Sequence, residues 1–171
     1  KGTRCMCGIV GLVYADSSRR CEGNVITKMR DVLAYRGPDD AGLYLDGPVG
    51  LGHRRLSIID LGGGHQPMST EDGAFSIVFN GEIYNYVELK REFQAERFAT
   101  QSDCELPLMT FARSGPSFAK PLRGMYAIAL SDARDHALHL ARDPFGIKPL
   151  YYADDGWTLR FASQAKALLA S

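Results

Sequence analysis

The sequence predicts an α+β domain: a four-layer α/β/β/α sandwich of two mostly antiparallel sheets, face to face, with helices outside both. Three observations lead to this prediction. Short apolar segments bounded by turn residues outnumber the helical ones. These segments do not alternate with helices as βαβ units would. Two of them, residues 126–132 and 137–142, are apolar on both faces, so each needs cover on two sides.

In the first half of the chain, the apolar run of residues 8–14 predicts a strand buried on both faces. Asn24 is a candidate N-cap for a helix that continues through Ala34, with apolar side chains at helical spacing. Turn residues then end the helix. Further short strands are predicted at residues 43–45, 49–53 and 55–59. The glycines at 62–64 lack the lysine and serine or threonine of a phosphate-binding loop, which favours a plain turn.

In the second half, a strand at residues 75–79 is predicted to stop at Asn80-Gly81, and Asn85 can cap a helix over residues 86–94. Ser102 and Glu105 have the spacing of a capping box, although Pro107 predicts a kink or a delayed helix start. Three further elements complete the chain: a buried hairpin of residues 126–132 and 137–142, a pairing of residues 150–153 with 159–162, and a final helix capped by Ser163.

The length of 171 residues fits one domain with a two-layer core. Twenty basic and twenty acidic residues balance without a basic block, so nothing indicates nucleic acid or an anionic membrane surface as a partner. No segment approaches the length of a membrane span. Four cysteines are too few for a disulfide scaffold, which favours a reducing, cytoplasmic location.

Two features near the N-terminus have alternative interpretations. Cys5 and Cys7 could form a metal or redox pair, but partner ligands at sensible spacing are missing. Residues 1–15 imitate a short secretory signal, although two glycines interrupt the apolar run. A buried first strand explains that run better.

Cys7 is the candidate nucleophile. It follows Met6, and trimming of a start methionine at this point would leave a cysteine with both a thiol and a free α-amine. An α-amine titrates near ~7.7 and a thiol near ~8.5, so such a residue carries its own general base. None of the four histidines falls in a Cys-His motif, although a thiol hydrolase with such a pair stays a distant alternative. Residues 1–6 are therefore interpreted as an extension (tag, propeptide or leader), and residues 7–171 as the domain.

Several segments in a fixed order then carry a family resemblance. The main ones are residues 6–11 (MCGIVG), 52–60 (GHRRLSIID), 79–86 (FNGEIYNY) and 101–105 (QSDCE). Supporting stretches are residues 35–39 (YRGPD), 64–68 (GHQPM), 122–127 (LRGMYA), 141–152 (ARDPFGIKPLYY) and 161–168 (FASQAKAL). From Met6 to the C-terminus the chain resembles the glutaminase domain of class II glutamine amidotransferases, nearest to the asparagine synthetase branch. The resemblance implies the N-terminal nucleophile hydrolase fold.

The resemblance also implies a role for each site residue. Cys7 would form a γ-glutamyl thioester with L-glutamine, releasing ammonia and then glutamate. Asn80 and the Gly81 N–H would hold the oxyanion, although Asn-Gly alone is also a strong hairpin-turn signal. Glutamine would be bound by Arg55 at its carboxylate, by Asp103 and Glu82 at its ammonium, and by backbone groups near Leu56, Ile58 and Ile59. Taken alone, Arg55 would more often be solvated and Asp103 a helix-start carboxylate.

Partners follow from the same resemblance. Ammonia would pass to an ATP-dependent synthetase domain or subunit, most simply one that makes asparagine; that domain is absent here, and a homodimer is possible. The glutaminase domain itself would need no cofactor or metal, since ATP and magnesium belong to the synthetase domain. The alternative is a non-catalytic amidotransferase domain that serves as a scaffold. The sequence departs from the family pattern at Tyr35, where histidine is usual, at Gln164, where glutamate is usual, and at Pro107.

Overall fold

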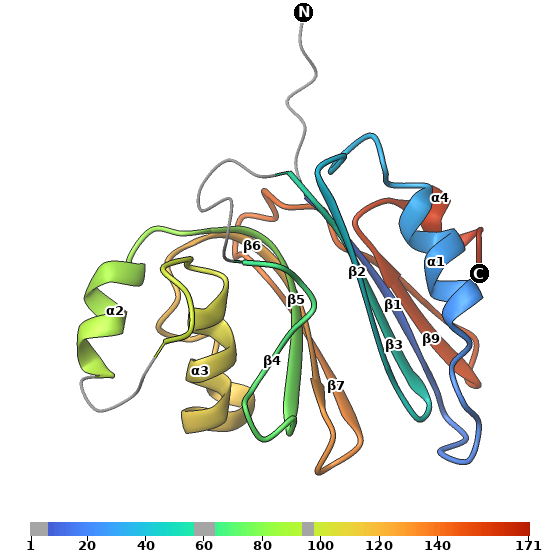
Figure 1. The fold of residues 1–171 in the computed structure, drawn as a ribbon, viewed down its shortest axis with the longest axis horizontal. Coiled ribbons are helices and arrows are strands. Elements are labelled where there is room, and N and C mark those ends of the chain that lie inside the picture. Colours follow the sequence, from blue (N-terminus) through green and yellow to red (C-terminus); the bar gives the residue numbers. More distant parts are fainter. Residues whose placement is uncertain (1–6, 57–63, 94–97) are drawn as a thin grey trace, which may run out of the picture.

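The computed structural model describes residues 7–56, 64–93 and 98–171, which fold into two facing β-sheets with helices on both outer faces. Figure 1 shows α2 and α3 outside one sheet, and α1 and α4 outside the other. All strand pairs within the described residues are antiparallel. The predicted four-layer α/β/β/α sandwich is therefore confirmed.

Sheet A has five strands in the order β2-β3-β1-β9-β8. Their bounds are Gly8–Tyr14 (β1), Asp40–Asp46 (β2), Val49–Arg55 (β3), Tyr151–Asp154 (β8) and Thr158–Ala162 (β9). The central strand β1 is buried along almost its whole length, as its uninterrupted apolar sequence predicts. It pairs with β3 on one side and with β9 on the other, which places Cys7 at the end of the sheet beside Arg55 and Leu56.

Sheet B has four strands in the order β4-β5-β6-β7. Their bounds are Met68–Ser69 (β4), Phe75–Ile83 (β5), Gly124–Asp132 (β6) and Ala137–Arg142 (β7). The predicted hairpin is confirmed as β6 and β7, with Asp132 opposite Ala137. β6 is buried as predicted, but the prediction that residues 137–142 are buried on both faces is wrong, because β7 is an edge strand of intermediate exposure.

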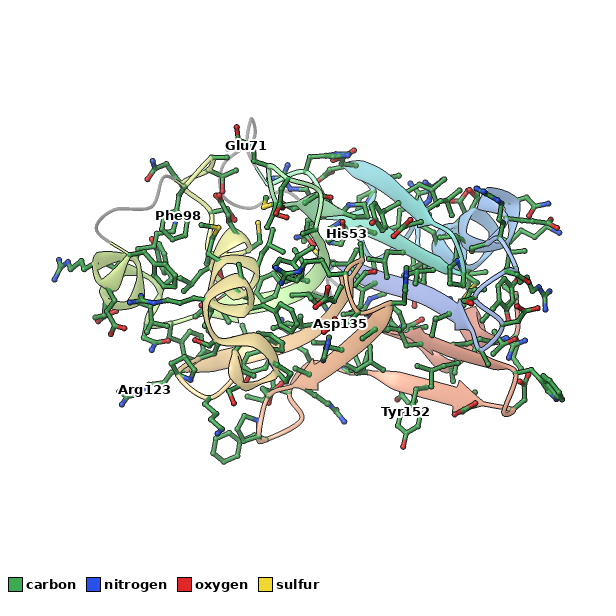
Figure 2. All side chains as sticks on the ribbon, turned by 90° about the horizontal axis from the view of Figure 1, so that it is seen from below. His53, Glu71, Phe98, Arg123, Asp135 and Tyr152 are labelled. Atoms are coloured by element: carbon green, nitrogen blue, oxygen red, sulfur yellow. The ribbon has the colours of Figure 1, made fainter. Side chains whose placement is uncertain are left out.

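Three apolar clusters hold the four layers together. Ile9, Leu51, Val78 and Phe161 belong to the cluster between the sheets. A second cluster joins sheet A to the helices α1 (Gly23–Asp31) and α4 (Ala165–Leu168). A third joins sheet B to α2 (Tyr86–Glu92) and α3 (Glu105–Ser114), and it includes Phe118, directly after the 3₁₀ helix η1 (Gly115–Ser117). Figure 2 shows His53 in the interior, whereas Arg123 and Tyr152 project from the periphery.

Several predicted helix caps are wrong. α1 begins at Gly23 and ends at Asp31, so Asn24 lies inside the helix. Ser102 and Glu105 do not form a capping box: α3 begins only at Glu105, whose carboxylate instead accepts hydrogen bonds from the backbone of Ala99 and Thr100. The delayed start predicted from Pro107 is confirmed, because proline then lies in the first turn, where its missing N–H leaves no intrahelical bond unmade.

Two more predicted capping residues, Ser163 and Asn85, use their side chains in tertiary contacts instead of capping a helix. Ser163 Oγ accepts a hydrogen bond from Ile9 N at 3.0 Å, which joins the end of β9 to β1. Asn85 precedes α2 but gives it no side-chain cap, since its amide bonds to Pro121 O and Arg123 N. Local capping signals were thus overridden by contacts distant in sequence.

The predicted end of the strand at Asn80-Gly81 is also wrong. β5 runs without interruption to Ile83, and Asn80, Gly81 and Glu82 pair with Ala127, Tyr126 and Met125 of β6. The hairpin-turn interpretation of Asn-Gly is therefore excluded. Of the predicted strand at residues 55–59, Arg55 is the last residue of β3, and residues 57–59 lie outside the described part of the chain.

Candidate active site

One cavity of about 160 Å³ brings together residues from both sheets. It contains most of the predicted site residues: Cys7, Arg55, Leu56, Asn80, Gly81, Glu82 and Asp103. The predicted positions Ile58 and Ile59 lie outside the described residues. Cys7, Arg55 and Leu56 come from the end of sheet A, whereas Asn80, Gly81 and Glu82 come from β5 of sheet B. The cavity therefore depends on how the two sheets sit against each other.

Cys7 lies directly before β1, and its thiol faces the backbone of Leu56. Leu56 N is 3.4 Å from Cys7 Sγ, while Arg36 Nε donates a hydrogen bond to Cys7 O at 3.2 Å. Burial raises the pKa of the Cys7 thiol, although the Leu56 backbone and the Arg55 charge act in the opposite direction. The thiol therefore rests protonated at neutral pH and needs a proton acceptor before it can attack.

Histidine does not provide that acceptor. All four histidines lie in the described part of the chain, and none of them lines the cavity. His53 is 1% exposed, and burial lowers its pKa to about 3, so it stays neutral. Its Nε2 lies 3.2 Å from Phe79 O rather than near Cys7. Among the described residues, therefore, no histidine lines the cavity beside Cys7 as a Cys-His thiol hydrolase would require.

On β5, the Gly81 N–H points away from β6, toward the side on which Gln66 and Asp103 line the cavity. Backbone groups alternate in direction along a strand, and Phe79 N and Ile83 N both bond on the side away from β6, to Gln66 Oε1 at 2.6 Å and Asp103 Oδ2 at 2.8 Å. Gly81 lies midway between them and therefore points the same way. A Cβ at Gly81 would lie 2.2 Å from Met125 O, so β6 requires glycine here.

Asn80 supplies a second donor. Its side chain is 2% exposed, and its Nδ2 finds no hydrogen-bond partner among the described residues. A buried amide donor without a partner is unfavourable by about 1–3 kcal/mol and is therefore rare unless it has a use. Two donors at neighbouring residues of one strand match the requirement for stabilising a tetrahedral oxyanion.

Charged groups of both signs line the cavity. Arg55, half-buried at the end of β3, offers a guanidinium that suits a carboxylate. Asp103 and the exposed Glu82 offer two carboxylates. Burial raises the pKa of Asp103, and the charge of Glu82 adds to that increase, whereas the Ile83 N–H opposes it. A cation bound beside these two carboxylates would favour their ionised form. The cavity therefore offers a guanidinium that suits a carboxylate and two carboxylates that suit an ammonium.

Sequence reasoning missed three residues of this site. Gln66 and Lys148 line the cavity, and Lys148 is only 6% exposed. The Lys148 backbone is held by Asp143 Oδ2 and Arg142 Nε, and its charge lowers the thiol pKa. Arg36, interpreted as part of a turn, instead holds the Cys7 carbonyl. All three lie in stretches that carried the resemblance, which was the one available signal.

Two positions at which the sequence departs from the family pattern touch each other. The Tyr35 hydroxyl donates a hydrogen bond to Gln164 Oε1, and Lys166 Nζ lies 4.0 Å from the centroid of the Tyr35 ring. Neither Tyr35 nor Gln164 lines the cavity. The departures therefore form one contact away from the candidate site.

The described ranges show no second kind of site near the N-terminus or on the helices. No group of three or more His, Cys, Asp and Glu side chains there is arranged to hold a metal ion. Cys5, the other member of the considered metal or redox pair, lies outside the described residues. Among the helices described, none is long and apolar enough to cross a bilayer.

The chain is similar to known proteins over nearly its whole length. A family described as a glutamine amidotransferase domain matches residues 6–171. The chain is 44% identical over 170 residues to asparagine synthetase (glutamine-hydrolyzing) 1 of Bacillus subtilis, aligning 97% of this chain with 27% of that protein. It is 38% identical over 167 residues to asparagine synthetase (glutamine-hydrolyzing) 3 of Arabidopsis thaliana, aligning 95% of this chain with 28% of that protein.

A solved structure supports the fold. Glutamine phosphoribosylpyrophosphate amidotransferase of B. subtilis superposes with a TM-score of 0.79 at 22% identity, over 96% of this chain and 43% of that one. The chain spans about a quarter of the length of the two asparagine synthetases. With a family match over residues 6–171 and relatives above one-third identity, the chain belongs to the class II glutamine amidotransferase domain family, with its relatives among the asparagine synthetases.

Proposed function

We propose that this domain hydrolyses L-glutamine to glutamate and ammonia through a thioester on Cys7. The observation that carries the proposal is that one cavity is lined by a thiol and by Asn80 and Gly81, and that the buried amide of Asn80 has no partner for its Nδ2 among the described residues. Family membership adds the substrate class. The proposed reaction requires Cys7 to be the N-terminal residue.

The proposed chemistry begins with the α-amine of Cys7 taking the thiol proton. The sulfur then attacks the side-chain carbonyl carbon of glutamine, and the Gly81 N–H and Asn80 Nδ2 hold the oxyanion. As the carbon–nitrogen bond breaks, the α-ammonium returns the proton to the leaving nitrogen, which departs as ammonia. Water next attacks the thioester carbon while the same amine takes a proton from it. The carbon–sulfur bond then breaks, the proton returns to the Cys7 sulfur, and glutamate leaves.

Glutamine would be recognised by the charged side chains that line the cavity. The guanidinium of Arg55 would bind the α-carboxylate, and the carboxylates of Asp103 and Glu82 would bind the α-ammonium. Leu56 would contribute backbone groups beside the thiol; the resemblance also assigns Ile58 and Ile59 to glutamine binding, and both lie outside the described residues. Both ends of the amino acid would then be fixed while its amide lies at Cys7.

The ammonia would pass to an ATP-dependent, amide-forming synthetase domain, most simply one that makes asparagine from aspartate. The names of the relatives and the quarter of their length that this chain spans support this partner. We propose no cofactor or metal for the glutaminase step, since the thiol, its own amine and backbone donors supply the chemistry. ATP and magnesium would act in the synthetase domain.

The proposal is tested with the chain trimmed to begin at Cys7, its mass verified. Ammonia and glutamate should form in equal amounts from glutamine, and a diazo-ketone analogue of glutamine should add once to Cys7 by mass spectrometry. The matched control is Cys7→Ala, which should do neither. Absence of both ammonia release and labelling in the trimmed chain would leave the scaffold interpretation in its place.

A further inference from the structure

Phe79, the residue before Asn80, has its backbone held at both polar groups by buried side chains. Phe79 N donates to Gln66 Oε1 at 2.6 Å, and Phe79 O lies 3.2 Å from His53 Nε2. A carbonyl oxygen only accepts hydrogen bonds, so Nε2 carries the proton of the neutral imidazole. Gln66 is 5% exposed and His53 1% exposed, so both bonds are shielded from water.

These side chains take the place of a neighbouring strand. β4 pairs with β5 only at Ile77 and Ser76, so that ladder ends before Phe79. Beyond that point, side chains form hydrogen bonds with the β5 backbone groups that point away from β6. Gln66 and His53 bond to Phe79, and Asp103 bonds to Ile83. Gly81 lies between these two fixed points.

Both residues that hold Phe79 are anchored to sheet A. His53 belongs to β3 and lies opposite Gly42 of β2. The Gln66 carbonyl packs onto the same Gly42, where an added Cβ would lie 1.7 Å from Gln66 O. His53 also lies opposite Ile9 of β1, two residues beyond Cys7. The Phe79 backbone of sheet B is therefore tied to the strands that carry the nucleophile.

We propose that Gln66, together with His53, is a positioning residue that sets the oxyanion donors of Asn80 and Gly81 against the thiol of Cys7. The inference rests on the proposed glutaminase function. Cys7 belongs to sheet A and the donors to sheet B, so the distance between them depends on contacts across the sheets. The Phe79 backbone is the point next to the donors where such contacts are made by hydrogen bonds.

The test uses two Gln66 variants in the chain trimmed to Cys7. Gln66→Met keeps the length of the side chain but removes the acceptor, whereas Gln66→Glu keeps an acceptor oxygen. Since misplacing a reacting group by about 1 Å costs on the order of 10²-fold in rate, Gln66→Met should lower kcat by roughly that factor with little change in KM for glutamine. Gln66→Glu should recover most of the loss. Thr110→Val, which removes a buried hydrogen bond inside α3, is the matched control and should leave kcat unchanged.

A second readout separates positioning from a general structural role. Glutamate γ-semialdehyde should bind by adding Cys7 to its aldehyde, which creates the tetrahedral oxygen that the donors hold. In Gln66→Met its inhibition constant should rise by about the factor by which kcat falls, while the KM for glutamine stays. In the double variant Gln66→Met/Asn80→Ala, the loss should be smaller than the product of the two single losses, because both act on the same donors.

Amide hydrogen exchange makes the inference independent of turnover. Exchange at Phe79 and at Asn80, which pairs with Ala127 of β6, should accelerate in Gln66→Met and in His53→Leu, while exchange at Val78 and Leu130, deep in the sheet, stays slow. Unchanged exchange at Asn80, or an unchanged kcat and aldehyde inhibition constant in folded Gln66→Met, would overturn the inference. If the wild-type chain itself neither releases ammonia nor binds the aldehyde, the proposed function fails, and the exchange data still decide whether Gln66 fixes the Asn80 backbone.

Discussion

Replacing Asn80 with alanine should separate catalysis from stability. Asn80 lies in β5, 2% exposed, and its Nδ2 has no partner among the described residues. The proposed oxyanion gives this donor its partner only during the reaction. Asn80→Ala should therefore weaken the transition state far more than it weakens the fold.

The expected changes in kcat and in stability both follow from the loss of Asn80 Nδ2. Removing one oxyanion donor usually lowers kcat by about 10²–10³, or about 2.7–4 kcal/mol in the barrier. Removing a buried unpaired donor also removes an unfavourable contribution of about 1–3 kcal/mol to the free energy of the folded state. That gain opposes the packing lost with the side chain. The free energy of unfolding should therefore change by no more than about 1 kcal/mol.

Glutaminase kinetics and urea denaturation of the trimmed chain measure the two effects side by side. KM for glutamine should stay near the wild-type value, since the proposed role of Asn80 is at the reacting carbonyl and not at the charged ends. Ser76→Ala in the same strand is the matched control: it breaks the 2.7 Å bond between Ser69 Oγ and Ser76 Oγ. It should lower stability by about 1 kcal/mol without changing kcat. A wild-type kcat in Asn80→Ala, or parallel losses of kcat and stability, would refute the reasoning.

Three further predictions concern neighbouring residues. Arg55→Ala should weaken glutamine binding about 10- to 100-fold, as loss of a charge-assisted pair would, with a much smaller change in kcat; unchanged affinity would refute its assignment. Gly81→Ala should lower stability by about 1–3 kcal/mol and abolish turnover, because its Cβ would meet Met125 O at 2.2 Å; denaturation and kinetics check this. His53 protonates near pH ~6.5 when unfolded but only near a pKa of about 3 when folded, so the unfolded state takes up the proton first and stability falls as the pH drops. His53 should thus contribute a loss of about 2 kcal/mol between pH 8 and pH 5; a pH dependence of unfolding as steep in His53→Leu as in the wild type would contradict it.

The fold followed from the sequence where the determining pattern was local. Apolar runs between turn residues identified strands such as β1 and β6. The four layers were predicted from two runs, residues 126–132 and 137–142, of which β6 is buried and the edge strand β7 is only partly buried. Helix starts were harder to predict, because a capping side chain can be used elsewhere. Ser163 bonds to Ile9 instead of its helix, and Glu105 bonds to Ala99 and Thr100. Such partners are distant in the chain or lie on irregular segments, so spacing alone does not reveal them.

The residues of the candidate site could be predicted from the sequence, but the strand pairing and the burial that bring them together could not. The resemblance selected seven described residues that line one cavity. It did not reveal that Asn80-Gly81 is the middle of a strand, because pairing with β6 overrides the local turn preference of this dipeptide. Gln66 and Lys148 were missed because their role depends on burial and on neighbours from other elements. Periodicity carries no information about such contacts.

The central claim is that the α-amine of Cys7 is the base, and the most direct test compares the chain with and without residues 1–6. In the extended chain the nitrogen of Cys7 is an amide, which has no basic lone pair to move the proton between thiol and leaving ammonia. Intact mass should define the N-terminus of each sample before ammonia release from glutamine is measured. The account predicts no glutaminase activity while Lys1 is present and activity once Cys7 is N-terminal. Full activity in protein proven by mass to retain Lys1 would mean that another group is the base and would contradict the account.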